Sequence, residues 1–316
     1  MEAWVESAFE RARAKFARGA KLAASQGIIP YKSEGGKYVA SPFDGNSWWT
    51  GGFWPAIMWQ LYKATGETVY MTEALRVEKL LTDEFRRFDL LNHDVGFMYL
   101  LSCGAHHRLT GDAQALTDTL HAATILAGRF NPEGFIRAWP NPDRAGYAII
   151  DCMMNLSLLY WATEQTGDPR FAKIARIHAD TTIREFLRED GSNCHICIFD
   201  PENGKVLSRP AGQGYCEGSS WSRGQAWALY GFTLSYLHTG KKEYLDTAKR
   251  VANYFISQIT DDYIPRCDFR QPEGDPLKDA CVRWTKAPPT GATASPPSST
   301  SAPAPTTARA TTTTSP

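Results

Sequence analysis

Four apolar segments of this chain end in the same way, and this repeat constrains the fold more than any other feature. Each segment stops at a Thr-Gly pair, and a helix-forming segment with a polar face follows it. The glycines of the four pairs are Gly66, Gly111, Gly167 and Gly240. Glycine readily adopts the left-handed conformation in which many helices terminate. The repeat therefore predicts four helical hairpins, each made of an apolar helix and an amphipathic one.

Such a hairpin cannot bury its apolar helix alone, so neighbouring hairpins are expected to stack around a common centre. Because apolar helices alternate with amphipathic ones, the pattern favours an all-α, two-layer α/α toroid over a linear solenoid. A further amphipathic helix is expected over residues 1–24, ended by Gly27 and Pro30. A six-hairpin ring needs about twelve helices, and residues 1–280 supply about nine or ten. We therefore expect the toroid domain to occupy residues 1–280 and to be incomplete at its carboxy-terminal end.

The remaining segment, residues 281–316, has a different composition. From Ala287 onward it contains only Ala, Pro, Thr, Ser, Gly and a single Arg. Nothing in such a segment offsets the entropy lost on ordering a chain. The composition predicts a low-complexity, disordered tail.

Charge and motif content exclude several classes of function. Lys+Arg and Asp+Glu are both 34, so no net charge favours nucleic acid or an anionic membrane. No apolar run approaches the roughly 18 residues of a membrane span, and the charged start is unlike a signal peptide. Phosphate-loop, dinucleotide and zinc-protease motifs are absent from the sequence. The scattered cysteines, with only Cys194 and Cys197 paired in spacing, predict neither a metal site nor disulfides, and point to the cytoplasm.

The longest apolar run, Tyr147–Trp161, contains one acid, Asp151. We expect this run to form a buried helix, with Asn155 on the same face as Asp151. An isolated carboxylate in apolar surroundings is unfavourable, and its pKa usually rises until the group can act as a general acid. A carboxyl that bridges neighbouring backbone in the core would explain the same residue.

Asp94 precedes a second apolar helix, expected over residues 97–109. It is either an ordinary helix cap or a second carboxylate on the rim of the toroid, facing Asp151. Two such carboxyls, one neutral and one ionised, are sufficient for acid–base chemistry on a sugar.

Aromatic and basic residues add a possible ligand surface. Trp48 and Trp49 fit either the core or a sugar platform, whereas Trp139 lies in a Pro- and Asn-rich loop with little core to join. Arg223 and Trp227 share one face at the start of a helix. That pair suits an anionic sugar ring or an internal cation–π contact. The long insertion over residues 188–222 is expected to be functional and to include a short strand at His195–Asp200.

Four motifs together resemble the unsaturated glucuronyl hydrolases of glycoside hydrolase family 88. They are Asn92–Phe97, Ile149–Leu156, Phe199–Gly204 and Trp221–Trp227, in a match that runs from about Trp48 to Phe269. The resemblance implies an (α/α)6 barrel and an oligosaccharide substrate with a Δ4,5-unsaturated uronate at its non-reducing end. The family hydrates the C4=C5 vinyl ether, and the hemiketal that forms collapses to release the remaining sugar. The resemblance implies that no metal ion and no organic cofactor is needed.

Carried over to this chain, the resemblance implies that Asp151 donates a proton to C4 and then acts as base towards the water that adds at C5. Asp94 would bind ring hydroxyls and support the charge of Asp151. The residues implied to line the pocket are Trp48 or Trp49, His93, Trp139, His195, Gln213, Arg223 and Trp227. The sequence departs from the family at Gly212, where a His is usual, and after Asp279, where the closing helices are expected. Two alternatives stay open, an unsaturated rhamnogalacturonyl hydrolase and an inactive sugar-binding toroid.

Overall fold

The four Thr-Gly pairs end four helices, as predicted. Their glycines have φ values of 71°, 76°, 72° and 68°, in the left-handed region. In each pair the threonine hydroxyl donates to the carbonyl four residues earlier and accepts the N–H two residues later, at 3.1–3.2 Å. The threonine thus satisfies backbone groups that a helix end leaves unpaired, which explains why it recurs beside glycine.

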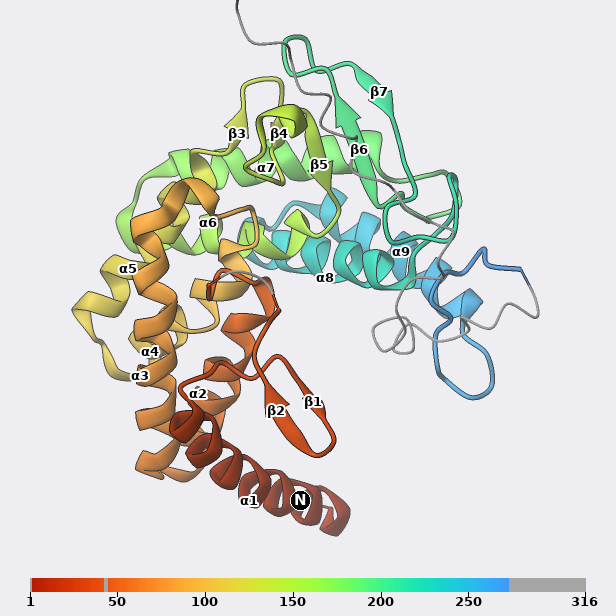
Figure 1. Cartoon of the computed structure of the whole chain (residues 1–316). Helices are drawn as coiled ribbons and strands as arrows, with labels where there is room; N and C mark the ends of the chain where they lie inside the picture. Colours follow the sequence, from red (N-terminus) through yellow and green to blue (C-terminus); the bar gives the residue numbers. More distant parts are fainter. Residues whose placement is uncertain (1, 43–44, 273–316) are drawn as a thin grey trace, which may run out of the picture.

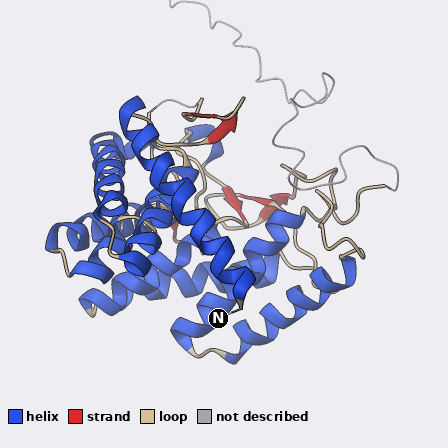
Figure 2. Cartoon of the chain, turned by 90° about the horizontal axis from the view of Figure 1, so that it is seen from below, coloured by secondary structure: helices blue, strands red, loops and turns tan. Residues whose placement is uncertain are grey.

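The computed structural model describes residues 2–42 and 45–272, and in these residues the chain forms nine α-helices with a few short strands (Figures 1 and 2). The helices are α1 (Ala3–Gln26), α2 (Phe53–Thr65), α3 (Thr68–Asp83), α4 (Cys103–Thr110), α5 (Ala113–Ala127), α6 (Cys152–Thr166), α7 (Pro169–Glu185), α8 (Ser222–Thr239) and α9 (Lys242–Gln258). Helix α1 begins and ends two residues later than the predicted helix over residues 1–24, and Gly27 is its C-cap.

The hairpins α2–α3, α4–α5, α6–α7 and α8–α9 follow one another along an arc (Figure 1). Helix α6 packs against its partner α7 and against α8 of the next hairpin, while α1 packs against α3. The alternation of apolar and amphipathic helices thus builds two layers, as expected for an α/α toroid. The described residues form four of the six hairpins of the predicted ring. The predicted tail, residues 281–316, lies outside the described residues.

The apolar run around Asp151 is not one helix. Its first residues form strand β5 (Tyr147–Ile149), and α6 begins only at Cys152. Strand β5 pairs with β6 (Ile196–Phe199) of the insertion, which supplies hydrogen bonds that a helix would otherwise provide. A short apolar run fits a buried strand as well as a helix, and here the distant partner decides. Asp151 therefore lies between a strand and a helix rather than within a helix.

The helix expected over residues 97–109 is also divided. Its first part is a π-helix, η3 (Gly96–Leu100), and α4 begins after a break at Ser102, where φ is −100° and ψ is −92°. The Ser102 hydroxyl donates to the carbonyl of Met98 at 2.6 Å. Side-chain bonds of this kind compete with the regular helical pattern. Single π-turns are rare and occur often at functional sites.

The strands are short and lie between the hairpins. They are β1 (Lys32–Glu34), β2 (Lys37–Val39), β3 (Phe130–Asn131), β4 (Phe135–Ile136), β5, β6 and β7 (Val206–Ser208). The last three form one antiparallel sheet in the order β5-β6-β7. The strand expected at His195–Asp200 is thereby found as β6. This sheet fixes the 188–222 insertion beside the start of α6.

Candidate active site

Each inner helix carries a predicted site residue at or just before its start. Trp49 begins the 3-10 turn η1 (Trp49–Gly52) that leads into α2, and Asp94 lies two residues before η3. Asp151 directly precedes α6, and Arg223 is the second residue of α8. The structure thus gathers the predicted residues at one rim of the toroid.

Asp94 lies in a polar turn beside buried histidine. Its backbone N–H donates to Asn92 Oδ1 at 2.7 Å, and its Oδ1 lies 3.4 Å from His93 Nε2. The side chains of His93 and Asp94 are 1% and 13% exposed. Burial lowers the pKa of His93 to about 4, so the ring is neutral at pH 7. Asp94 therefore faces little positive charge from its own turn.

Asn155 connects the two carboxyl-bearing segments. Its Oδ1 accepts the Phe97 N–H at 2.8 Å, and its Nδ2 lies 3.2 Å from the Asp151 carbonyl and 3.5 Å from Asp94 Oδ1. The residue is fully buried. A Cβ at Gly96 would lie 2.6 Å from Asn155 Oδ1, so only glycine allows this approach. Asn155 is not among the predicted site residues, although its spacing of four from Asp151 in the sequence pointed to it.

The two carboxyl groups have opposite pKa shifts. Burial, together with the nearby charge of Asp151, raises the pKa of Asp94 to about 8. Burial opposes ionisation of Asp151 as well, but the neighbouring imidazole of His195, followed by His93 and then the guanidinium of Arg223, lowers its pKa below the usual value. At pH 7 the pair therefore holds one proton, and Asp94 carries it.

This distribution differs from the expectation that apolar neighbours keep Asp151 protonated. The residues adjacent in sequence are indeed buried, but His195 approaches from the insertion with Nε2 3.6 Å from Asp151 Oδ2. Arg223 contributes from α8. Polar groups from distant segments thus outweigh the apolar residues of the run.

Arg223 is held between aromatic rings. Its guanidinium carbon lies 4.4 Å from the Trp221 ring centroid and 6.0 Å from that of Trp49. Its Nη2 donates to Gln213 Oε1 at 2.7 Å. The internal cation–π interpretation of this arginine is therefore confirmed. Its role in binding an anionic sugar ring stays a prediction, and its charge helps to lower the pKa of Asp151. Trp221, which also contacts His195, begins the Trp221–Trp227 motif but was not predicted as a site residue.

Aromatic side chains form one wall of the site. Ring centroids of Trp49 and Trp227 are 6.3 Å apart, and Phe97 lies 5.2 Å from Trp49 and 5.4 Å from Trp227. Phe97 lies in η3, three residues after Asp94 in the sequence. The wall is therefore continuous with the turn that carries one carboxyl group.

Trp139 lies in the loop that reaches the same turn. The His93 N–H donates to the carbonyl of Ala138 at 3.0 Å. The Trp139 ring packs 5.6 Å from Tyr147, and the guanidinium of Arg144 lies 5.1 Å from its centroid. The loop assignment was correct, and Arg144 is an unforeseen neighbour.

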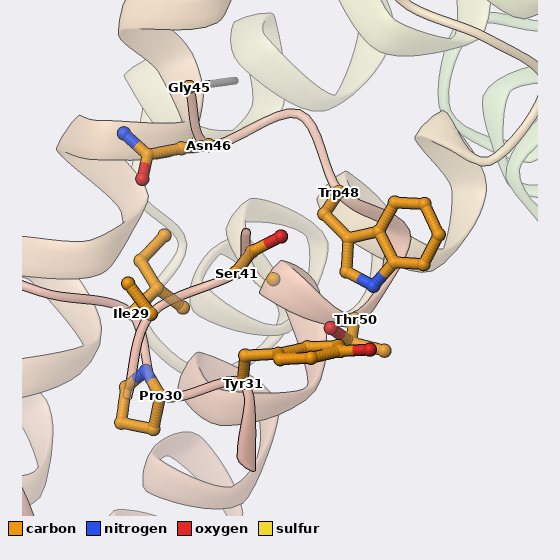
Figure 3. A pocket seen from close by; sticks show the side chains of 10 residues that line it. Ile29, Pro30, Tyr31, Ser41, Gly45, Asn46, Trp48 and Thr50 are labelled. Carbon is orange, nitrogen blue, oxygen red and sulfur yellow. The ribbon is translucent and has the colours of Figure 1, made fainter. Parts of the chain in front are cut away.

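Trp48 lines a separate hollow to which Trp49 does not contribute. The Trp48 and Tyr31 rings meet edge to face, with centroids 6.4 Å apart (Figure 3). Together with Thr50 and Asn46 they line a space of about 330 Å³ that is partly open to solvent. Trp48 and Trp49 are 6.4 Å apart, so the hollow adjoins the aromatic wall.

Within the described residues, no three His, Cys, Asp or Glu side chains converge as a metal ligand set. Cys194 and Cys197 face each other with their Sγ atoms 3.4 Å apart, as unlinked thiols. In these same parts of the chain, none of the helices combines the length and the apolar character that crossing a membrane requires.

A helical toroid with two partly buried carboxyl groups beside indole rings has the features of a protein that acts on sugar rings. The model of Glycosyl Hydrolase Family 88 matches residues 28–264. The chain is 40% identical over 251 residues to the unsaturated glucuronyl hydrolase of Bacillus sp. (strain GL1), covering 78% of this chain and 66% of that protein. It is 35% identical over 232 residues to the unsaturated chondroitin disaccharide hydrolase of Streptococcus pneumoniae, covering 72% and 59%. The chain therefore belongs to glycosyl hydrolase family 88.

Solved structures agree with this assignment. The crystal structure of the Bacillus sp. GL1 unsaturated glucuronyl hydrolase superposes with a TM-score of 0.80 at 38% identity, covering 86% of this chain and 72% of that one. An unsaturated glucuronyl hydrolase specific for heparin superposes with a TM-score of 0.74 at 33% identity, covering 85% and 74%. The fold is thus the α/α toroid of these enzymes. The chain spans 66% and 59% of the lengths of the two curated relatives.

Proposed function

We propose that this protein is an unsaturated glucuronyl hydrolase. It removes a Δ4,5-unsaturated uronate from the non-reducing end of oligosaccharides produced by polysaccharide lyases. The observation that carries the proposal is the pair of carboxyl groups, Asp94 and Asp151, which lie on segments joined by Asn155, near Arg223 and an aromatic wall. Family membership and the names of the relatives support it.

The substrate chemistry fits one acid and one base. In a Δ4,5-uronate the ring oxygen donates electron density into the double bond, so C4 accepts a proton and positive charge develops at C5. A water molecule adds at C5 as a base removes its proton. The resulting hemiketal opens, and the bond from C1 to the leaving sugar breaks. Proton transfer and water addition account for every step.

We assign Asp151 the delivery of the proton to C4 and Asp94 the storage of that proton in the free protein. The uronate carboxylate would bind at Arg223 and neutralise part of the charge that lowers the pKa of Asp151. Asp151 then carries the proton of the pair, gives it to C4, and removes a proton from the attacking water. Trp49 and Trp227 would contact the ring, with His93, Trp139, His195 and Gln213 around it.

The first test uses the isosteric substitution Asp151→Asn. We expect a loss of at least about 10³-fold in kcat, because the variant can neither donate to C4 nor accept from water. The absorbance of an unsaturated chondroitin disaccharide reports turnover, and calorimetry reports binding, which should persist. Asp246→Asn, on the exposed side of α9, is the matched control. Wild-type turnover in Asp151→Asn would refute the role assigned to Asp151.

A substrate panel separates the alternatives. Relatives are named for chondroitin disaccharide and for heparin, and one solved relative at 37% identity, with a TM-score of 0.77, is described with dGlcA-Glc-Rha-Glc. Turnover of an unsaturated rhamnogalacturonan product alone would indicate a rhamnogalacturonyl hydrolase. Binding without loss of absorbance for every substrate would indicate a non-catalytic sugar-binding toroid.

We also propose that the protein works in the cytoplasm. The support is chemical, since Cys194 and Cys197 lie 3.4 Å apart as thiols and Cys216 is exposed. Fractionation of cells that express the full gene tests the location.

A further inference from the structure

We infer that the surface turn at Gly212–Gln213 is a positioning element, which fixes His195 in the tautomer that carries its hydrogen on Nε2 and aims that hydrogen at Asp151. The consequence for catalysis rests on the function proposed above. The inference about the tautomer does not rest on that function, and the tautomer can be measured separately.

The tautomer follows from a backbone donor. The Gln213 N–H donates to His195 Nδ1 at 2.9 Å. A backbone N–H can only donate, so Nδ1 is an acceptor and the single hydrogen of the neutral ring is on Nε2. Nε2 lies 3.6 Å from Asp151 Oδ2. The turn thus directs a hydrogen-bond donor at the carboxylate to which proton delivery is assigned.

The sheet holds the backbone of His195 in register with Asp151. The carbonyl of His195 accepts the N–H of Ile150, the residue before Asp151, at 3.0 Å. The imidazole also packs against Trp221, with ring centroids 4.4 Å apart. Backbone and ring are therefore both restrained, and the turn supplies the remaining constraint on which nitrogen carries the hydrogen.

Only glycine at position 212 allows this contact. Gly212 has a φ of 59°, and a Cβ there would overlap His195 Nδ1 and lie 2.7 Å from its Cε1. A side chain at this position would push the imidazole away from Gln213. Because Gly212 has no side chain, it leaves room for the hydrogen bond from the Gln213 N–H to His195 Nδ1.

The same turn also orients the neighbouring cation. Gln213 Oε1 accepts a hydrogen bond from Arg223 Nη2 at 2.7 Å. The loop that follows is anchored by Asp268, whose carboxylate accepts the N–H groups of Tyr215 and Ser220 at 3.0 and 2.9 Å. Gln213 thus contacts His195 through its backbone N–H and Arg223 through its side chain, and both of these residues stabilise the Asp151 carboxylate.

The first test is ¹⁵N NMR of the full chain labelled at histidine, with His195→Gln used to assign the signal. We expect His195 of the wild-type protein to show an unprotonated Nδ1 and a protonated Nε2 at pH 7. A protonated Nδ1 would overturn the inference, whether or not the protein hydrolyses a sugar. This measurement requires no folded variant in the turn.

The second test compares Gly212→Ala with Gly218→Ala. Both glycines lie in the same loop with positive φ, but a Cβ at Gly218 meets nothing within 4 Å. Backbone strain is therefore similar, and the two positions differ in the contacts that a Cβ at Gly212 would make with His195 and with the neighbouring Ile196. We expect Gly212→Ala to lower kcat about 10- to 100-fold, with a smaller change in KM and loss of the Nε2-protonated signal. Gly218→Ala should retain wild-type values.

Equal effects of the two substitutions, or an unchanged His195 signal in Gly212→Ala, would overturn the positioning role. If no substrate is turned over by the wild type, the proposed function fails. The tautomer measurement still decides the inference in that case.

Discussion

At the scale of single residues, Asp94 and Asp151 lie on neighbouring segments, and the side chain of Asn155 reaches both of these segments. Asp94 was predicted from its place before an apolar helix, and Asp151 from its place inside an apolar run. The proton could not be assigned, because His195 and Arg223 approach Asp151 from segments distant in the chain. Likewise, nothing local to Gly212 shows that it faces a histidine. Which polar side chains meet depends on the tertiary structure, whereas the apolar pattern that predicts a helix lies in neighbouring residues of the sequence.

The raised pKa of Asp94 predicts a pH-dependent effect on stability. Its folded-state pKa of about 8 exceeds the unfolded value, so its contribution is most favourable at low pH and is lost as the pH rises towards 8. Asp94→Asn lacks this titration. We therefore expect the free energy of unfolding of the variant, relative to wild type, to increase between pH 4.5 and pH 8, by up to about 5 kcal/mol.

Urea unfolding at several pH values measures this difference, with Asp246→Asn as the exposed control. Parallel stability curves for wild type and Asp94→Asn would contradict the raised pKa. The same group should cause activity to decline as the pH passes about 8, because the pair then loses its proton.

Asn155 is expected to be essential for both stability and turnover. Asn155→Leu keeps a similar volume but leaves the buried Phe97 N–H without its acceptor. The free energy of unfolding should fall by about 1–3 kcal/mol. The kcat should fall as well, because Asp94 loses a neighbouring donor, and chemical denaturation with steady-state kinetics measures both. Unchanged stability would show that the Phe97 N–H finds another partner.

At the scale of elements, helix ends were predictable and helix interruptions were not. The Thr-Gly caps are local in sequence, and all four were found. The π-turn η3 and strand β5 were missed because each depends on a distant partner, Asn155 for the first and β6 for the second. Close approaches between helices could not be predicted either, because a glycine within a helix does not indicate which residue of another helix lies opposite it.

The crossing of α6 and α8 provides a test at this scale. A Cβ at Gly231 would lie 2.5 Å from Met153 Cβ and 2.7 Å from its carbonyl oxygen. Alanine is the better helix former by about 1 kcal/mol, yet we expect Gly231→Ala to lower stability by about 2 kcal/mol through overpacking. Gly167→Ala, at an open helix cap, should lose only about 1–2 kcal/mol from backbone strain. A more stable Gly231→Ala in thermal unfolding would contradict the close packing.

At the scale of the molecule, the alternation of helix types was enough to predict the toroid. The β5-β6-β7 sheet was not foreseen as a unit, because its pairing joins residues far apart in the chain. Burial is uneven along the arc. Helix α6 is buried over most of its length, whereas the buried residues of α1 are Gly19, Ala20 and Ala23.

This gradient predicts the order of amide hydrogen exchange. Amides in the middle of α6 should exchange only through global unfolding, and those in the first half of α1 through local opening. We expect the two sets to differ by at least about 100-fold in protection, measured by mass spectrometry of the full chain. Equal protection would show that α1 is held by contacts other than those with α3.

The shared direction of the inner helices has an electrostatic consequence for whatever enters the site. Helices α2, α6 and α8 all begin at the rim that carries Trp49, Asp151 and Arg223. Their peptide dipoles consequently point their positive ends at the same place. A sugar acid diffusing past would experience this field beyond the reach of any hydrogen bond, and added salt would weaken it. Capture of an acidic sugar would then depend on ionic strength, whereas capture of its neutral ester would not.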